Sequence, residues 1–130
     1  MLNNDNGIIH QPSSHSVDDT MQRLSEILRT MGITLFAVVD HSGEAEKAGL
    51  KMPPTKLAIF GNPRGGTSLM LAAPTSALDL PLKVLVWQDA EGAVWLSFNS
   101  AEFLQTRHGI PAEFHGLLAG VGDLAAAASK

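Results

Sequence analysis

The sequence predicts an α+β fold: a mixed β-sheet with a late antiparallel hairpin, packed against a long N-terminal helix and a C-terminal helix. Three observations support this prediction. In segment 17–31, apolar residues recur at three- and four-residue spacing, as in an amphipathic helix. Segments 33–39 and 57–60 are almost continuously apolar, as in buried strands. Segments 82–88 and 93–99 form a predicted hairpin, and a hairpin so late in the chain argues against a purely doubly wound sheet.

The length of 130 residues predicts one domain, which we place at residues 7–130. Residues 1–6 are polar and are expected to be disordered. They carry no Lys or Arg and no apolar stretch follows them, so no signal peptide is predicted. No apolar run reaches the roughly 18 residues that cross a bilayer. We therefore expect a cytoplasmic protein without membrane contact.

The first half of the chain is expected to run strand, helix, strand, short helix, strand. A strand at 7–10 precedes a helix that Ser16 caps and Gly32 ends. Segment 33–39 is apolar on both alternating faces, which predicts a central strand covered on both sides. A short helix at 44–48 then leads to the strand at 57–60. The apolar stripe of the first helix consists of Val17, Met21, Leu24, Leu28 and Met31.

The second half is expected to contain a turn at 61–66, a short helix at 67–73, the hairpin and two helices. The predicted hairpin register places Val86 opposite Leu96, and Val84 opposite Phe98, on the core face. The opposite face would carry Trp87, Trp95, Leu85, Lys83 and Asn99. Ser100 is expected to cap a helix through Arg107. A final helix from Pro111 would point Phe114, Leu117, Leu118, Val121 and Leu124 inward.

Composition excludes several classes of function. The chain has no cysteine, so disulfides, thiolate metal sites and cysteine nucleophiles are excluded. Its net charge of −4 argues against a general affinity for nucleic acid. None of the five His residues is paired at the i, i+4 spacing that places two imidazoles on one helix face, so no metal site is predicted. No motif identifies a cofactor.

A glycine-rich segment is the first candidate for ligand binding. It comprises Gly61, Asn62, Arg64, Gly66 and Thr67, and it lies between a predicted strand and a predicted helix. Backbone N–H groups and a helix N-terminus in this context can hold an anion. Thr67 occupies the position where a P-loop has its lysine, so nucleotide hydrolysis is not predicted. The structural alternative is a tight turn with Thr67 as the helix N-cap.

His41, Asp79 and Lys83 are further candidates because each lies at the end of a predicted element. Asp40, His41 and Ser42 are the residue types of a hydrolytic triad, but sequence neighbours point to opposite faces and cannot form the relay. Asp79 and Lys83 near Trp87 could orient a polar ligand. In the structural alternative, the His and Asp cap turns and the stem of Lys83 covers an edge.

Trp87 and Trp95 are predicted to share one face of the hairpin, where they make a larger apolar patch than a monomer usually exposes. Three explanations stay open at this point: packing under a helix, a dimer interface, or part of a ligand site.

Three segments of the chain form a recognisable pattern in this order: Gly32-Ile33-x-Leu35-Phe36-Ala37-x-Val39-Asp40-His41, Leu57-x-Ile59-Phe60-Gly61-Asn62-Pro63 and Leu78-Asp79-Leu80-Pro81-Leu82-Lys83. In these segments the sequence resembles the bacterial and archaeal family catalogued as domain of unknown function 302. The resemblance implies a small α+β fold that associates as a homodimer, and it implies no particular activity. A Tyr that is common in the hairpin of relatives has no counterpart here, because the chain contains no Tyr.

Three functional hypotheses follow. The first is a homodimeric binding or sensing module for a small anionic ligand, with His41, Gly61, Asn62, Arg64, Gly66, Thr67, Asp79 and Lys83 as candidate binding residues. The second is a small enzyme in which His41 or Asp79 acts as acid or base. The third is a protein-interaction module that uses the face with Trp87 and Trp95.

Overall fold

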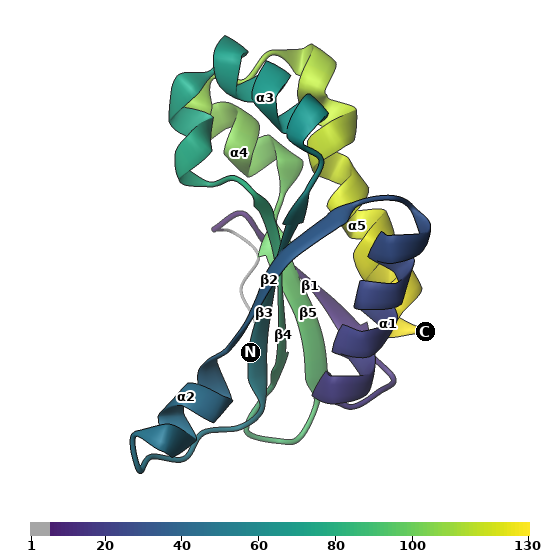
Figure 1. Cartoon of the computed structure of the whole chain (residues 1–130), viewed down its shortest axis with the longest axis vertical. Coiled ribbons are helices and arrows are strands. Elements are labelled where there is room, and N and C mark those ends of the chain that lie inside the picture. Colours follow the sequence, from purple (N-terminus) through teal and green to yellow (C-terminus); the bar gives the residue numbers. More distant parts are fainter. Residues whose placement is uncertain (1–5) are drawn as a thin grey trace.

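The computed structural model describes residues 6–130 as an α+β arrangement of one sheet and its helices (Figure 1). Residues 1–5 lie outside the described part, so the disorder predicted for residues 1–6 is not tested there. The strands are β1 (Ile8–Ser13), β2 (Thr34–Asp40), β3 (Thr55–Gly61), β4 (Leu82–Gln88) and β5 (Val94–Asn99). The helices are α1 (Val17–Thr30), α2 (His41–Lys47), α3 (Pro63–Ala72), α4 (Ala101–His108) and α5 (His115–Ser129), with short 3₁₀ turns η1 (Pro74–Leu78) and η2 (Ala112–Phe114).

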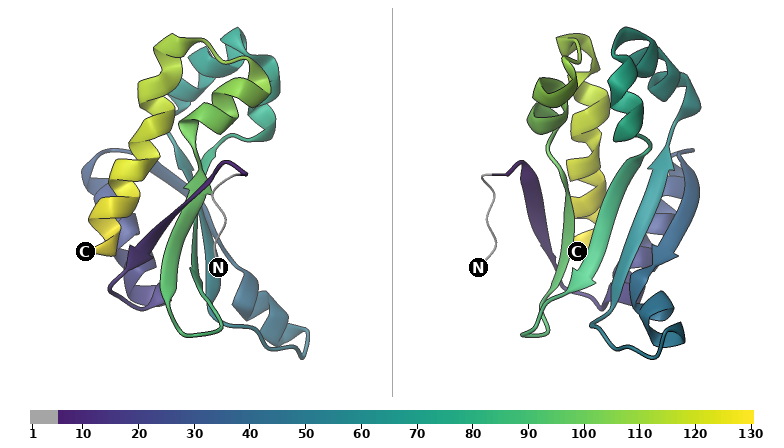
Figure 2. Two further views of the ribbon diagram at one scale, coloured as in Figure 1. Left: turned by 180° about the vertical axis from the view of Figure 1, so that it is seen from behind. Right: turned by 90° about the vertical axis from the view of Figure 1, so that its left-hand side faces the viewer.

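The sheet has five strands in the order β1-β5-β4-β3-β2, and every neighbouring pair is antiparallel (Figure 2). The prediction of a mixed sheet was therefore wrong. The physical reason is the path of α1, which carries the chain from β1 at one edge to β2 at the other. The two strands joined by this helix are never neighbours, so no parallel pair forms.

Helices α1 and α5 cover one face of the sheet and enclose the main core (Figures 1 and 2). Ser16 caps α1 as predicted, because its Oγ accepts a hydrogen bond of 3.0 Å from the Asp19 N–H. Leu24 and Leu28 of α1 are fully buried against Val84, Val86 and Leu96 of the sheet, among other residues. The predicted stripe ends earlier than expected, since Met31 is 61% exposed.

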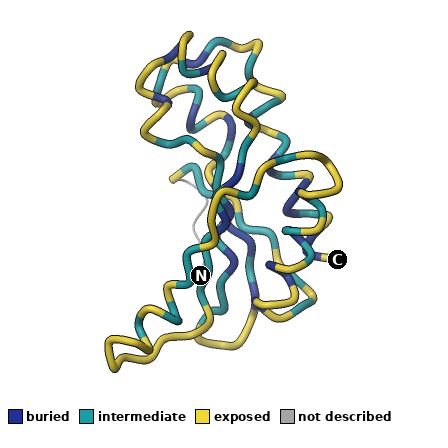
Figure 3. The backbone as a smooth tube through the Cα atoms, viewed as in Figure 1, coloured by how far each residue is buried: buried dark blue, intermediate teal, exposed yellow. Residues whose placement is uncertain are grey.

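A second, smaller core lies at the end of the sheet that carries α3, η1 and α4. Its buried residues are Leu69, Ala73, Ala101, Leu104, Ile110 and Leu118. Helix α5 contributes Leu118 to this cluster and Val121 and Leu124 to the main core, so it connects the two. Helix α2 lies at the opposite end of the sheet. It buries no residue, and α2 and the loop after it are largely exposed (Figure 3).

The hairpin register confirms the predicted pairing of Val86 with Leu96 and places Trp87 opposite Trp95. Segment 33–39, in contrast, is not a central strand. It forms most of β2, which lies at an edge of the sheet, and Phe36 and Val38 are 50% and 41% exposed. Its apolar composition predicted burial on two faces, but strand order depends on long-range pairing that local composition does not encode. No helix formed by residues 6–130 is both long and apolar enough to cross a membrane.

Candidate ligand cavity

A cavity of about 500 Å³ lies where α3 and α5 meet the end of the sheet. Residues that belong to or pack against each of the two core clusters line it, so it lies where the two cores meet. Of the described residues that line it, none is charged, and only Asn62 and Thr67 have polar side chains. The lining consists of Met31, Ile33, Phe36, Phe60, Gly61, Asn62, Pro63, Gly66, Thr67, Met70, Leu80, Pro81, Leu82, Leu117, Gly120, Val121 and Leu124.

The glycine-rich segment forms the first turns of α3 rather than a loop. Pro63 is the first helical residue, and Asn62 caps the helix by accepting a 3.1 Å hydrogen bond from the Arg64 N–H. The predicted helix start at Thr67 was wrong because proline suits the first turn, where its missing N–H costs nothing. As a result, Gly66 and Thr67 lie on a helix beside the cavity instead of in a phosphate-binding loop.

A β-bulge in β2 places Phe36 at the cavity. Leu35 pairs with Phe60 and Ala37 pairs with Ile59, so Phe36 is the extra residue between two consecutive partners. Bulges change the direction of a side chain relative to the alternation of the strand. The ring of Phe36 lies near Gly61, where an added Cβ would be 3.6 Å from ring atom Cε2.

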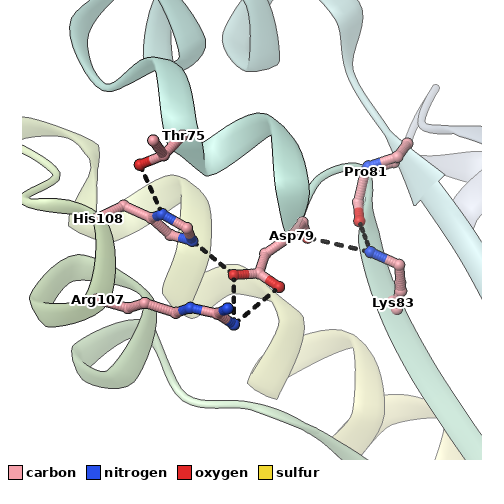
Figure 4. A network of polar contacts seen from close by, with 6 residues as sticks. All are labelled: Thr75, Asp79, Pro81, Lys83, Arg107 and His108. Atoms are coloured by element: carbon pink, nitrogen blue, oxygen red, sulfur yellow. Dashed lines mark hydrogen bonds and ion pairs between the residues drawn. The ribbon is translucent and has the colours of Figure 1, made fainter.

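Another part of the cavity lining is the segment Leu80-Pro81-Leu82. A network of polar side chains holds this segment in place (Figure 4). The Asp79 carboxylate contacts Arg107 Nη1 at 3.2 Å and the Nε2 atom of His108, and both partners belong to α4. Lys83 Nζ donates to the backbone carbonyls of Asp79 (3.1 Å) and Pro81 (2.9 Å). Burial lowers the pKa of Lys83, and the charge of Asp79 opposes this shift. The network fixes the chain between η1 and β4.

The polar chain extends through His108 to Thr75, whose Oγ1 lies 2.9 Å from His108 Nδ1. The His108 side chain is only 3% exposed, so the carboxylate and the hydroxyl satisfy an almost fully buried imidazole. Neither Thr75 nor His108 lines the cavity. Asp79 could be identified from the sequence but its partners could not, because no sequence pattern links it to residues 28 and 29 positions away.

The structure brings only some of the predicted site residues together. Gly61, Asn62, Gly66 and Thr67 line the cavity, whereas Arg64 is exposed and does not. Asp79 and Lys83 lie behind the cavity lining, in the network described above.

His41 lies far from the other candidates, as the first residue of α2. Its neighbour Asp40 pairs with Lys56, which pairs with Val86 on β4, three residues from Lys83. Strand spacing places the Cα atoms of Asp40 and Lys83 roughly 14 Å apart. The structure therefore does not bring His41 to Asp79 and Lys83.

Asp40 acts as a helix cap. Its carboxylate accepts hydrogen bonds from the Gly43 N–H (2.9 Å) and the Ser42 hydroxyl (2.8 Å). The Gly43 N–H and then the Ser42 hydroxyl hold the pKa of Asp40 below its ordinary value of 3.8. Asp40 is thus the N-cap of α2, which begins at His41 rather than at the predicted residue 44.

The face with Trp87 and Trp95 points away from α1 and α5, because the alternate residues Val86 and Leu96 point toward them. Trp87 Nε1 donates to Ser97 Oγ at 2.8 Å, and the same oxygen lies 2.6 Å from His10 Nδ1. Both indole rings are half-buried. This face is separate from the cavity.

No three His, Asp or Glu side chains among residues 6–130 lie close enough together to hold a metal ion. The residues around the cavity are suited instead to an organic molecule with a largely apolar surface. The apolar residues of the lining were not among the predicted site residues; the chief ones are Met31, Phe36, Met70 and Leu117. The sequence signal at this place is the set of three glycines in α5, which is as typical of close helix packing as of an opening.

Comparison with known proteins places this fold in a family. Residues 9–127 match the family model described as domain of unknown function DUF302. The crystal structure of an uncharacterized conserved protein, DUF302, from Bacillus stearothermophilus matches with a TM-score of 0.77 over 95% of both chains at 18% identity, a likeness of fold.

Two curated relatives are named as fluoride-specific ion channels. Fluoride-specific ion channel FluC 1 of Brucella suis is 44% identical over 106 residues, which make up 82% of this chain and 42% of that protein. Fluoride-specific ion channel FluC 2 of Brucella melitensis shows the same identity over 106 residues, 39% of its length. The chain thus spans about two fifths of the length of these relatives.

Proposed function

The chain belongs to the family described as domain of unknown function DUF302, a description that states no activity, and we propose that it is a binding or sensing module for a small ligand with a largely apolar body. The observation that carries this proposal is the cavity of about 500 Å³ between the two cores. Channel activity is not proposed for this chain, because it matches only about two fifths of each fluoride channel.

The size and chemistry of the cavity support a ligand rather than a packing gap. Small-molecule sites in proteins commonly occupy about 300–1,000 Å³ and are lined mainly by apolar side chains with a few polar groups. Protein interiors otherwise leave few voids larger than a water molecule. An apolar ligand would cover the exposed surfaces of Met31 and Phe36 and would bury the half-buried Leu82 and Leu117 further.

The polar end of the ligand is assigned to the side of the cavity formed by Asn62 and Thr67. Asn62 is the N-cap of α3 and Thr67 lies in its second turn, so both are close to the helix end at which the dipole favours negative charge. Arg64 is exposed in the same turn and adds a positive charge nearby. This arrangement supports an anionic ligand only when the anion carries an apolar body, so the proposed class is small apolar carboxylic acids and similar amphipathic molecules.

Calorimetric titration with octanoate, octanol and inorganic phosphate tests the proposal. We expect octanoate to bind, octanol to bind more weakly and phosphate not to bind. Each additional methylene of the acid should tighten binding about fourfold, because burying a CH₂ is worth about 0.8 kcal/mol. Binding of phosphate with no binding of octanoate would contradict the apolar class and favour a simple anion site. No binding of any of the three would overturn the proposal.

A second copy of this chain is the proposed protein partner, through the uncovered face of the sheet. This face carries Leu57, Leu85, Trp87 and Trp95, all of which are only half-buried. A contiguous apolar face of this kind is typical of an interaction surface. Since it is separate from the cavity, association and ligand binding are independent in this proposal.

A further inference from the structure

Two helical glycines line the cavity without a backbone or packing reason to be glycine. Gly66 lies in α3 and Gly120 in the middle of α5, and neither has the positive φ that favours glycine. A Cβ built on either residue would meet no atom within 4 Å. Glycine in a helix interior is less favourable than alanine by about 1 kcal/mol. Each of these glycines therefore lowers the stability of its helix, and neither backbone conformation nor packing requires it.

The neighbouring contact between the two helices is different. A Cβ on Gly65 would lie 2.5 Å from Leu117 Cδ1, so α3 and α5 touch there and the end of the Leu117 side chain would have to shift to admit a methyl group. Gly66 is the next residue of α3, and Gly120 lies about one turn along α5 from Leu117. The two glycines therefore extend the cavity beside the point at which the helices touch.

We propose that Gly66 and Gly120 determine which ligands this cavity accepts, by keeping space for a bulky, ring-containing apolar body between α3 and α5. The inference rests on the proposed binding function and deepens it. A thin alkyl chain needs less of this space than a ligand with fused or linked rings. The proposed ligand is thus a bulky amphipathic acid, and the two glycines are its specificity-determining residues.

Fluorescence titration with anilinonaphthalene sulfonate, an acid with two aromatic ring systems, tests this inference, with hexanoate displacement as the thin-chain comparison. Gly120→Leu should weaken binding of the aromatic probe at least about tenfold, as expected when added methylenes obstruct an apolar site. Hexanoate should lose much less affinity. Gly116→Leu is the matched control, because Gly116 is exposed in the same helix, does not line the cavity and also has no atom within 4 Å of a built Cβ.

Two alanine variants provide the same test if Gly120→Leu does not fold. Gly120→Ala and Gly122→Ala make the same change two residues apart in α5, and a Cβ on Gly122 meets only Phe98 Cζ at an ordinary 3.9 Å. Both should raise the melting temperature by a few degrees, because alanine favours the helix. Only Gly120→Ala should weaken the aromatic probe, so this variant gains stability and loses binding.

The outcomes separate the inference from the function on which it rests. If the wild type binds neither probe nor acid, the proposed function is wrong. A second outcome is that the wild type binds and Gly120→Leu binds the aromatic probe as tightly as its control, Gly116→Leu. The inference is then overturned, while the binding function stands. If Gly120→Leu does not fold, the same comparison is made between Gly120→Ala and Gly122→Ala. Equal losses for the aromatic probe and hexanoate would also overturn the inference, because size selection would then be absent.

Discussion

Asp89 organises the turn between β4 and β5 through several hydrogen bonds. Its Oδ2 accepts from Trp95 Nε1 at 3.0 Å, and its Oδ1 accepts from the backbone N–H groups of Glu91 (3.0 Å) and Ala93 (2.9 Å). The Trp95 N–H is the main cause of a pKa below the ordinary value of 3.8; burial opposes this shift, and the backbone N–H groups of the turn add to it.

This lowered pKa predicts a loss of stability in acid. The unfolded chain binds a proton at Asp89 at higher pH than the folded chain does, so the contribution of Asp89 is complete above its ordinary pKa of 3.8 and is lost as pH falls through the lower, folded value. Thermal melts from neutral pH to about pH 2 should show a smaller acid-induced fall for Asp89→Asn than for the wild type. Glu91→Gln changes the same charge in the same turn and should retain the wild-type slope. An unchanged slope in Asp89→Asn would contradict the prediction.

The sequence indicated which polar residues have a specific role better than it indicated what that role is. Asp79 and Lys83 were candidates for ligand binding because they end predicted elements, and the structure instead places them in a network with Arg107 and His108. The partners come from α4, far along the chain, so only the tertiary fold reveals that these charges satisfy one another. Asn62 was a candidate in a loop and proved to be a helix cap beside the cavity.

At the scale of elements, the β-bulge in β2 determines which side chain of this strand lines the cavity. The bulge places Phe36 at the cavity, 50% exposed, while Val38 on the same strand is 41% exposed and does not line it. The two side chains therefore have similar exposure but different surroundings.

Phe36→Ala should weaken ligand binding with little effect on folding. Loss of contact with the ring should reduce octanoate affinity roughly three- to tenfold, since the apolar area that the ring covers on the ligand is worth about 1 kcal/mol. Its cost to the free energy of unfolding should stay well below the roughly 3–5 kcal/mol of a fully buried phenylalanine. Val38→Ala is the control and should leave affinity unchanged. Calorimetry and urea denaturation measure the two quantities, and equal affinities for the two variants would contradict a role for Phe36 at the cavity.

Helix caps and the hairpin register depend on nearby residues and could be predicted. The order of the strands depends on pairing between distant segments and could not. The capping of α1 by Ser16 and of α4 by Ser100, and the register of Val86 with Leu96, follow from local sequence and are confirmed. The strand order is set by which edges pair across the whole sheet, so the central position of β2 and the mixed sheet were wrong. The cavity could not be predicted because its lining comes from segments spread between residues 31 and 124.

At the scale of the whole molecule, the sheet has one covered face and one uncovered face. Helices α1 and α5 bury Val84, Val86 and Leu96, whereas Leu85 in the middle strand of the sheet points the other way, between its partners Leu57 and Ser97. A monomer would leave this apolar face in water, and a second copy could cover it by a symmetric contact. The hydrophobic effect would then favour a dimer.

Leu85→Glu tests this arrangement because it places a carboxylate near the centre of the proposed interface. Burying that charge without a partner opposes association, so light scattering should report a dimer for the wild type and a monomer for the variant. Leu71→Glu is the control, since Leu71 is 79% exposed on α3 and the same change there should leave the dimer intact. The melting temperature of each variant, measured below the dissociation concentration, separates a lost interface from a lost fold. A monomeric wild type, or a Leu85→Glu protein that remains dimeric, would exclude the uncovered face as the site of self-association.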